Sequence, residues 1–263
     1  MSPLQSLLSI ASGGIVGLSL GLLGGGGSIM AVPLLLYVVR LANPHVVIGT
    51  SAFAVSLNAY LNLIPHARAG HVRWKPAIAL AIPGVFGALL GAYFGHRANG
   101  HDLLFLFAIL MIVIAVLMLR SPRATEPRQP DPHEGAGTRY ARVLPTGFLV
   151  GALSGFFGIG GGFLIVPGLV FSSGLTMIEA IGSSLVAVGT FGLTTAISYT
   201  VLGLINWLVL AEYTLGGVLG GYFGYRLATR LSHQRRALNL IFSAVIILVA
   251  IYMIDQNLSV LHL

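Results

Sequence analysis

The sequence predicts an all-α polytopic membrane protein with two inverted repeats, each a glycine-broken helical hairpin followed by three transmembrane helices. Of its 263 residues, 56% are hydrophobic and only 8% are charged, which is far less charge than soluble domains carry. Apolar runs at 77–94, 103–119, 185–202 and 241–254 approach the ~20 residues that span a bilayer. These runs are continuous rather than alternating, which argues against transmembrane strands.

A glycine-rich segment occurs twice, and it predicts a break in a membrane helix in each half of the chain. Residues 21–33 (GLLGGGGSIMAVP) and 155–167 (GFFGIGGGFLIVP) lie 134 positions apart. Four glycines inside an apolar run disfavour regular helix. Paired broken helices in two halves are typical of transport sites.

Further motif pairs extend the duplication over most of the chain. GTS at 49–51 matches GSS at 182–184, GHVRW at 70–74 matches GLINW at 203–207, and GAYFGHR at 91–97 matches GGYFGYR at 220–226. Such self-similarity indicates an internal repeat. The offset falls from 134 to 133 to 129, which predicts one extra helical turn in the first half between Trp74 and Gly87.

A charged, proline-rich linker divides the two repeats, so we expect repeat 1 at 1–119, the linker at 120–142 and repeat 2 at 143–263. The linker holds four prolines, five arginines and three acidic residues. It cannot bury a core, and we expect it to be solvated and mostly disordered.

The basic residues favour halves of opposite orientation. If each glycine-rich segment returns to the side it entered, 12 of the 14 lysines and arginines fall on one side, and only Arg40 and Arg97 on the other. If each segment crosses once, the division is 8 to 6. The positive-inside rule favours the first arrangement, with a cytoplasmic linker and both termini outside.

The expected segments follow from that arrangement. They are a hairpin at 4–40, helices at about 46–65, 75–97 and 102–120, a hairpin at 143–173, and helices at about 177–202, 206–228 and 236–255. Residues 4–39 would extend about 54 Å as one helix, too long for one ~30 Å crossing. Whether the hairpin tips cross fully or are re-entrant stays open.

The glycine runs are the first candidate for binding chemistry, with an anion as the expected ligand. Glycine lets backbone amides face a small cavity, and a helix that starts after the run directs its positive end there. Two facing cups would result, formed by Gly25, Gly26, Gly27 and Ser28 in one half and by Gly160, Gly161 and Gly162 in the other. Close helix packing through small residues is the alternative for such glycines.

Two matching hydroxyl pairs are the second candidate. Thr50 and Ser51 match Ser183 and Ser184, each pair near the start of an expected helix. Hydroxyls there can donate to an anion, or they can simply cap the helix.

Glu212 is the one acidic residue well inside an expected span. A carboxylate there is costly when ionised, which suits a proton-coupling residue, although it can also reach the surface or fix helix packing. The histidines form no ligand cluster, and His66, His71, His96 and His101 are expected in loops. We therefore expect no metal and no cofactor.

The repeated glycine segment that runs into Val-Pro resembles the TauE/SafE family of sulfite and organosulfonate exporters. The resemblance covers about residues 7–254, and the first copy departs from the second by Ser28 in place of Gly162. It implies export of sulfite or a small sulfonate such as sulfoacetate across the bacterial inner membrane.

Together, these features predict a secondary transporter with alternating access and partners limited to a small anion and the lipid bilayer. The positive net charge lies in short loops and does not indicate nucleic-acid binding. An anion channel of the same fold, a permease for another small carboxylate or sulfonate, and a membrane enzyme or scaffold are the alternatives. The absence of a nucleophile–base arrangement argues against an enzyme. Coupling ion, direction of flux and oligomeric state stay open.

Overall fold

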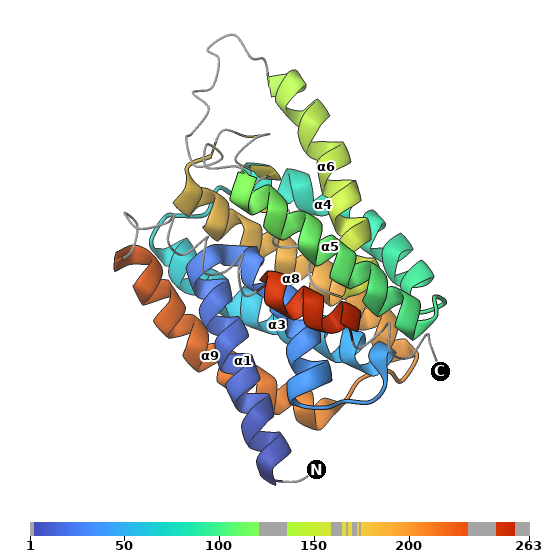
Figure 1. The fold of residues 1–263 in the computed structure, drawn as a ribbon. Coiled ribbons are helices and arrows are strands. Elements are labelled where there is room, and N and C mark those ends of the chain that lie inside the picture. Colours follow the sequence, from blue (N-terminus) through green and yellow to red (C-terminus); the bar gives the residue numbers. More distant parts are fainter. Residues whose placement is uncertain are drawn as a thin grey trace.

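The computed structural model describes residues 3–120, 136–158, 175–230 and 246–255, with the shorter pieces 165–166, 168–169 and 173. Regular structure in these residues is entirely helical (Figure 1), which agrees with the predicted all-α class. The long helices are α1 (Pro3–Leu23), α3 (Pro44–Arg68), α4 (Trp74–Gly95), α5 (Gly100–Arg120), α6 (Ala136–Phe157), α8 (Met177–Val201) and α9 (Trp207–Arg230). A shorter helix spans Ile246–Asp255.

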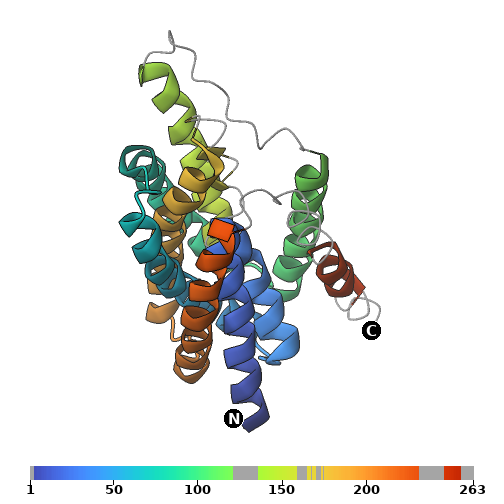
Figure 2. The same cartoon turned by 90° about the vertical axis from the view of Figure 1, so that its left-hand side faces the viewer.

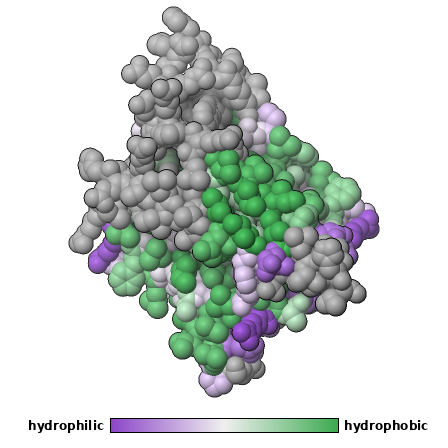
Figure 3. All heavy atoms as spheres, viewed as in Figure 1, coloured by the Kyte–Doolittle hydropathy of each residue, from purple (hydrophilic) through white to green (hydrophobic). Residues whose placement is uncertain are grey.

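Four described helices, α1, α3, α4 and α8, are long and apolar enough to cross a membrane. The face in Figure 3 carries a broad hydrophobic surface. Large apolar side chains on the outside of the bundle, such as Phe86, Leu149, Leu219 and Phe223, are each about 60% exposed. Such a surface suits lipid rather than water.

The first hairpin breaks at the glycine run, as predicted. After α1 the chain forms a 3-10 segment (η1, Gly24–Met30), one α turn (α2, Ala31–Pro33) and a π turn (η2, Leu34–Val38). A Cβ on Gly27 would lie 2.5 Å from backbone atoms of Ser19 and Leu20, so the chain folds back against α1. Figures 1 and 2 show this segment returning toward the level of the N-terminal end of α1.

The first helix of each half packs along a helix of the other half. Gly13, Gly17 and Gly21 of α1 meet Tyr213, Gly217 and Gly221 of α9 in ascending order, so these helices run parallel. The same contact recurs between α6 and α4, where Gly147, Gly151 and Gly155 meet Leu80, Gly84 and Ala88. In both pairs the missing Cβ atoms let the two backbones touch.

The central pair, α3 and α8, runs antiparallel. Ser56 donates to the carbonyl of Gly189 at 2.7 Å near the middle of both helices. Gly49, near the N-terminal end of α3, packs against Tyr199, near the C-terminal end of α8. Each helix has 25 residues, and α8 begins and ends 133 positions after α3. Figure 2 shows α5 and the helix at Ile246–Asp255 standing to one side of this bundle.

The predicted extra turn between Trp74 and Gly87 is wrong. Gly84, Gly87 and Gly91 make the same contacts as Gly217, Gly220 and Gly224, at a constant offset of 133. Helix α4 has 22 residues and α9 has 24, so the first half is not longer there. The glycine positions, not the similar Tyr-Phe-Gly letters, set the register, because only glycine fits where the two backbones touch.

The predicted linker at 120–142 is described at its two ends. Helix α6 begins at Ala136, so its first turns lie within residues that were expected to form the linker. The remainder of the predicted linker, 121–135, lies outside the described residues.

Candidate functional site

Both glycine corners begin with a residue in a left-handed backbone conformation, which only glycine adopts easily. Gly24 has φ +66° directly after α1, and its counterpart Gly158 has φ +67° directly after α6. A side chain is strained in this left-handed region. The corner at Gly24 continues into η1, while Gly160, Gly161 and Gly162 lie outside the described residues.

Each corner rests on the beginning of the central helix of the other half. The Gly25 N–H donates to Ser184 Oγ at 3.2 Å, and Ser184 Oγ donates to the carbonyl of Ile181 at 2.7 Å. In the mirrored position, Ser51 Oγ lies 3.2 Å from the Gly158 carbonyl and 2.9 Å from the Ile48 carbonyl. The second hydroxyl of the sequence pairs thus joins the two halves reciprocally.

The first hydroxyl of each pair accepts a hydrogen bond from the loop that precedes a long helix of the other half. Thr50 Oγ1 accepts a hydrogen bond from the Asn206 N–H at 3.0 Å, just before α9. Ser183 Oγ accepts from the Arg73 N–H at 2.8 Å, just before α4. Neither hydroxyl acts as an N-cap, because α3 is capped by Asn43 and α8 by Thr176.

The groups of this reciprocal junction are fully buried and hydrogen-bonded within the protein. Thr50, Ser51, Ser183 and Ser184 each have 0% exposure, and so does Ser28, whose Oγ donates to the Gly25 carbonyl at 2.8 Å. The described site residues therefore gather in two groups, one near the beginning of α8 with Gly25, Ser28, Ser183 and Ser184 and one near the beginning of α3 with Thr50 and Ser51.

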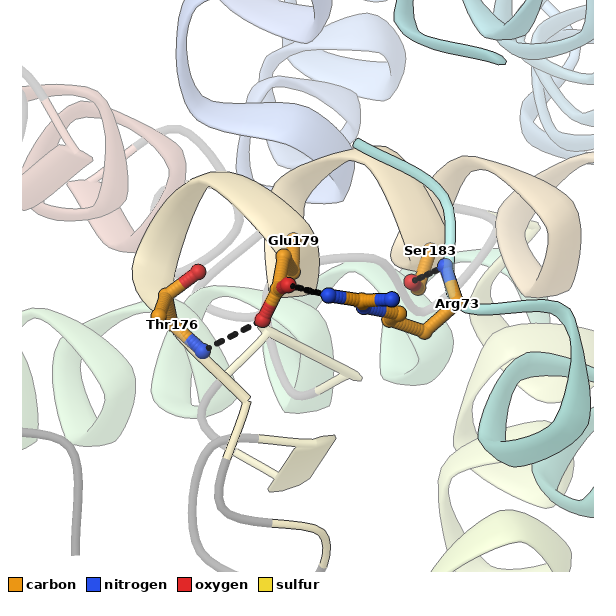
Figure 4. A network of polar contacts seen from close by, with 4 residues as sticks. All are labelled: Arg73, Thr176, Glu179 and Ser183. Carbon is orange, nitrogen blue, oxygen red and sulfur yellow. Dashed lines mark hydrogen bonds and ion pairs between the residues drawn. The ribbon is translucent and has the colours of Figure 1, made fainter. Parts of the chain in front are cut away.

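An ion pair reinforces one end of the junction (Figure 4). Arg73 Nε donates to Glu179 Oε1 at 2.8 Å, and the other carboxylate oxygen of Glu179 accepts from the Thr176 N–H at 3.1 Å. Glu179 and Thr176 form a capping box at the start of α8, so the carboxylate is oriented before it meets the arginine. Sequence inspection missed this pair, since its members lie more than a hundred residues apart in different halves.

Glu212 lies on α9, half-buried, away from the residues that form the junction. Its Oε2 is buried and has no hydrogen-bond partner among the described residues.

His66 is not a loop residue, contrary to the expectation from sequence. It lies inside α3, has 0% exposure, and its ring contacts those of His71 and Tyr225 with centroids 5.8 Å and 5.0 Å apart. Pro65 suggested a helix end, but α3 continues to Arg68 because the Pro65 carbonyl still accepts from the Ala69 N–H at 3.0 Å. His71 does follow the helix, as expected. Groups of three or more histidine or acidic side chains that could hold a metal are absent from the described residues.

Comparisons with known proteins agree with this arrangement of apolar helices. The family model "Sulfite exporter TauE/SafE" matches residues 9–253. A probable membrane transporter protein of Xylella fastidiosa (strain Temecula1) is 53% identical over 97% of both chains. The probable membrane transporter protein YunE of Bacillus subtilis is 27% identical over 96% of this chain and 98% of its own. No solved structure gives a significant match.

Proposed function

The chain belongs to the TauE/SafE family, and on that premise we propose that it is a secondary transporter that exports a small sulfur oxyanion across the inner membrane. Sulfite is the substrate that the family description names, and organosulfonates such as sulfoacetate complete the proposed substrate class. The observation that carries the proposal is the reciprocal junction, in which each glycine corner rests on the hydroxyl pair of the other half.

Two inverted repeats, 1–119 and 143–263, form the transporter. The matched lengths of α3 and α8 and the constant offset of the glycine contacts support duplication, and the antiparallel course of these two equivalent helices supports inversion. Inverted repeats give a transporter an outward-facing and an inward-facing state of similar energy, because the two halves can exchange their conformations.

The orientation proposed from the basic residues has a cytoplasmic linker and external termini. In Figure 1 the C-terminal ends of α5 and α9 and the N-terminal end of α6 lie toward one side, and the N-terminal end of α1 toward the other. The chain has no cysteine. Single cysteines in place of Ser6 and Ser121 therefore test this orientation with a membrane-impermeant maleimide, which must label Ser6→Cys from outside and Ser121→Cys only from within.

The anion binds at the junction, between the corner of Gly25, Gly26, Gly27 and Ser28 and the corner of Gly160, Gly161 and Gly162. Backbone amides and the hydroxyls of Thr50, Ser51, Ser183 and Ser184 supply the donors. Arg73 contacts Ser183 through its backbone N–H, and its guanidinium pairs with Glu179. A site of dipoles without a free cation binds weakly enough to release its substrate on the other side.

Saturable flux of sulfite and sulfoacetate in proteoliposomes tests the proposal. Gly26→Val must abolish it, because a branched side chain fills the corner, while Gly14→Ala serves as the folded control with its new Cβ 3.7 Å from the nearest backbone oxygen. Flux that never saturates, or single-channel currents, would favour an anion channel instead. Wild-type protein that moves no small anion would overturn the proposal.

Glu212 is the first candidate for proton coupling within the transporter. Its buried, unpartnered carboxylate oxygen supports this role. Glu212→Gln must then change the pH dependence of sulfoacetate flux, and an unchanged dependence removes Glu212 from it.

A further inference from the structure

A line of buried polar side chains runs along one face of α3. Asn58, Asn62 and His66 follow one another at four-residue intervals and have 0%, 4% and 0% exposure. Residues at that spacing share one side of a helix. All three therefore face the same neighbours over about two helical turns.

Those neighbours are α9 and, behind it, α1. Gly217 and Gly221 of α9 lie against the amides of Asn58 and Asn62, and the Tyr225 ring meets His66 edge to face. The same two glycines meet Gly17 and Gly21 of α1. Three helices thus enclose the line, which we term the polar track and define as Asn58, Asn62 and His66.

The polar track is under-bonded for its burial. The amide of Asn62 donates to the Asn58 carbonyl at 2.8 Å. Both side-chain polar atoms of Asn58 lack a hydrogen-bond partner among the described residues, while the His66 ring interacts with the Gly21 backbone of α1 and with no described side-chain acceptor. The hydroxyls of Ser12 on α1 and Tyr213 on α9 lack one as well. Native proteins rarely tolerate such groups unless they have a role in binding.

The fold itself does not need this polarity, as the second half demonstrates. The counterparts of the track, 133 positions later, are Phe191, Thr195 and Tyr199. The Phe191 ring packs on Gly84 where Asn58 packs on Gly217, and Thr195 donates to the carbonyl of Phe191 at 3.0 Å. The Tyr199 hydroxyl also lacks a partner. An aromatic ring therefore fills this space well, and the asparagine needs another explanation.

A groove at one end of the track connects it to the surface. It has a volume of about 580 Å³ and lies between α3 and α9, with Asn62, Arg68, Tyr222 and Tyr225 among its lining residues. Tyr225 lines the groove and touches the His66 ring, so it links the buried imidazole to the opening.

We propose that the polar track, in place of Glu212, is the coupling-proton site of the transporter, with His66 as the residue that holds the proton and the Arg68 groove as its entrance. This assignment rests on the proposed anion transport. His66 gains one proton and becomes an imidazolium whose two N–H groups both donate, and it returns the same proton when the state changes. Asn58 and Asn62 extend the row of hydrogen-bond donors from His66 along α3 without adding charge.

The groups around His66 make its protonation depend on a bound anion. Helix α1 offers no titratable residue, α9 offers Tyr225, the loop after α3 offers His71, and α3 itself offers Arg68 in the groove. No described carboxylate contacts the ring, so an imidazolium there has no internal counter-ion. A transported anion supplies that charge, and linkage then requires that protonation raise anion affinity by the same factor.

Two measurements on wild-type protein and His66→Gln test the site. In proteoliposomes, sulfoacetate flux of wild type is expected to change about tenfold between about pH 6 and pH 8, and that of His66→Gln less than about twofold. His45→Gln is the matched control, because His45 lies on the same helix with an unpartnered Nδ1 but outside the track. In micelles, the NMR titration midpoint of the wild-type His66 ring is expected to rise by about one pH unit with saturating sulfoacetate.

Failure of the site and failure of transport give different results. Wild type that moves no sulfoacetate overturns the proposed function. Wild type that moves it while the His66 midpoint stays fixed overturns the proton site alone, and so does a His66→Gln variant with wild-type pH dependence. If His66→Gln does not fold, the wild-type NMR titration decides.

Discussion

The interface of α1, α3 and α9 and the interface of α6, α8 and α4 share one backbone framework but differ in chemistry. Gly17 meets Gly217 in the first as Gly151 meets Gly84 in the second. Yet Asn58 occupies the first where Phe191 occupies the second. Glycine contacts fix how close the helices lie, while the space beside each glycine accepts either an amide or a ring.

The two ends of the junction differ in the same way. Both loops donate a backbone N–H to a hydroxyl, but only Arg73 adds an ion pair, with Glu179. Asn206 stands in the position of Arg73, and Val46 in the position of Glu179. The backbone-to-hydroxyl hydrogen bonds are therefore present at both ends of the junction, whereas the ion pair is present only at the end that contains Arg73.

The largest expected effect comes from the shared framework and must be equal in both halves. In Gly17→Ala and Gly151→Ala the new Cβ would lie far inside van der Waals contact with the carbonyl oxygens of Gly217 and Gly84, respectively. Backbone cannot move aside as a side chain does, so each change is expected to cost about 3 kcal/mol or more. Thermal unfolding in detergent, with Gly14→Ala as control, measures this. A loss in one half only would break the equivalence.

The hydroxyls of the junction are expected to have smaller and unequal effects. Ser184→Ala leaves the buried Gly25 N–H without an acceptor, a cost of about 1–2 kcal/mol, whereas Ser51→Ala removes one donor from carbonyls that have other lone pairs and costs about 0.5–1 kcal/mol. The same unfolding measurement ranks them. Equal costs, or the reverse order, would contradict these hydrogen-bond assignments.

Replacing the polar track by apolar side chains is expected to separate stability from activity. Asn58→Leu removes two unpartnered buried atoms, so the free energy of unfolding stays the same or rises by about 1 kcal/mol, while proton-coupled sulfoacetate flux falls. Phe191→Leu, its counterpart, is expected to cost about 1–2 kcal/mol and to leave the pH dependence of flux intact. A strongly destabilised Asn58→Leu would indicate that Asn58 is structural.

The ion pair is expected to have the smallest effect on stability. Arg73 is 58% exposed and Glu179 17% exposed at their side chains. Solvent screens such a pair, so Arg73→Gln is expected to lower the free energy of unfolding by less than about 1 kcal/mol. High salt must reduce the difference in the free energy of unfolding between wild type and Arg73→Gln. A difference that is independent of salt would show that the charge is not its cause.

Sequence patterns predicted the helices and the break at Gly24 well, because glycine runs and apolar lengths act locally. They could not predict that each hydroxyl bonds to the other half of the chain, since Gly25 and its acceptor Ser184 are 159 residues apart in the sequence. The similar Tyr-Phe-Gly motifs suggested a wrong alignment of the two halves. Their positions are less restricted by packing than Gly87 and Gly220, which lie where two helix backbones touch. His66 was misjudged because a proline precedes it, although the proline carbonyl still continues the helix.

Movement of the two halves against each other is most directly tested by locking the junction at either end. Because α3 and α8 are antiparallel, the contacts of Arg73 with Ser183 and of Thr50 with Asn206 lie at opposite ends of the central pair. The cysteine-free chain allows a disulfide at each contact, in Arg73→Cys/Ser183→Cys and in Thr50→Cys/Asn206→Cys. Alternating access predicts that oxidation of either pair stops sulfoacetate flux and that reduction restores it, with the single-cysteine variants indifferent to both. Unchanged flux through fully cross-linked protein would contradict it.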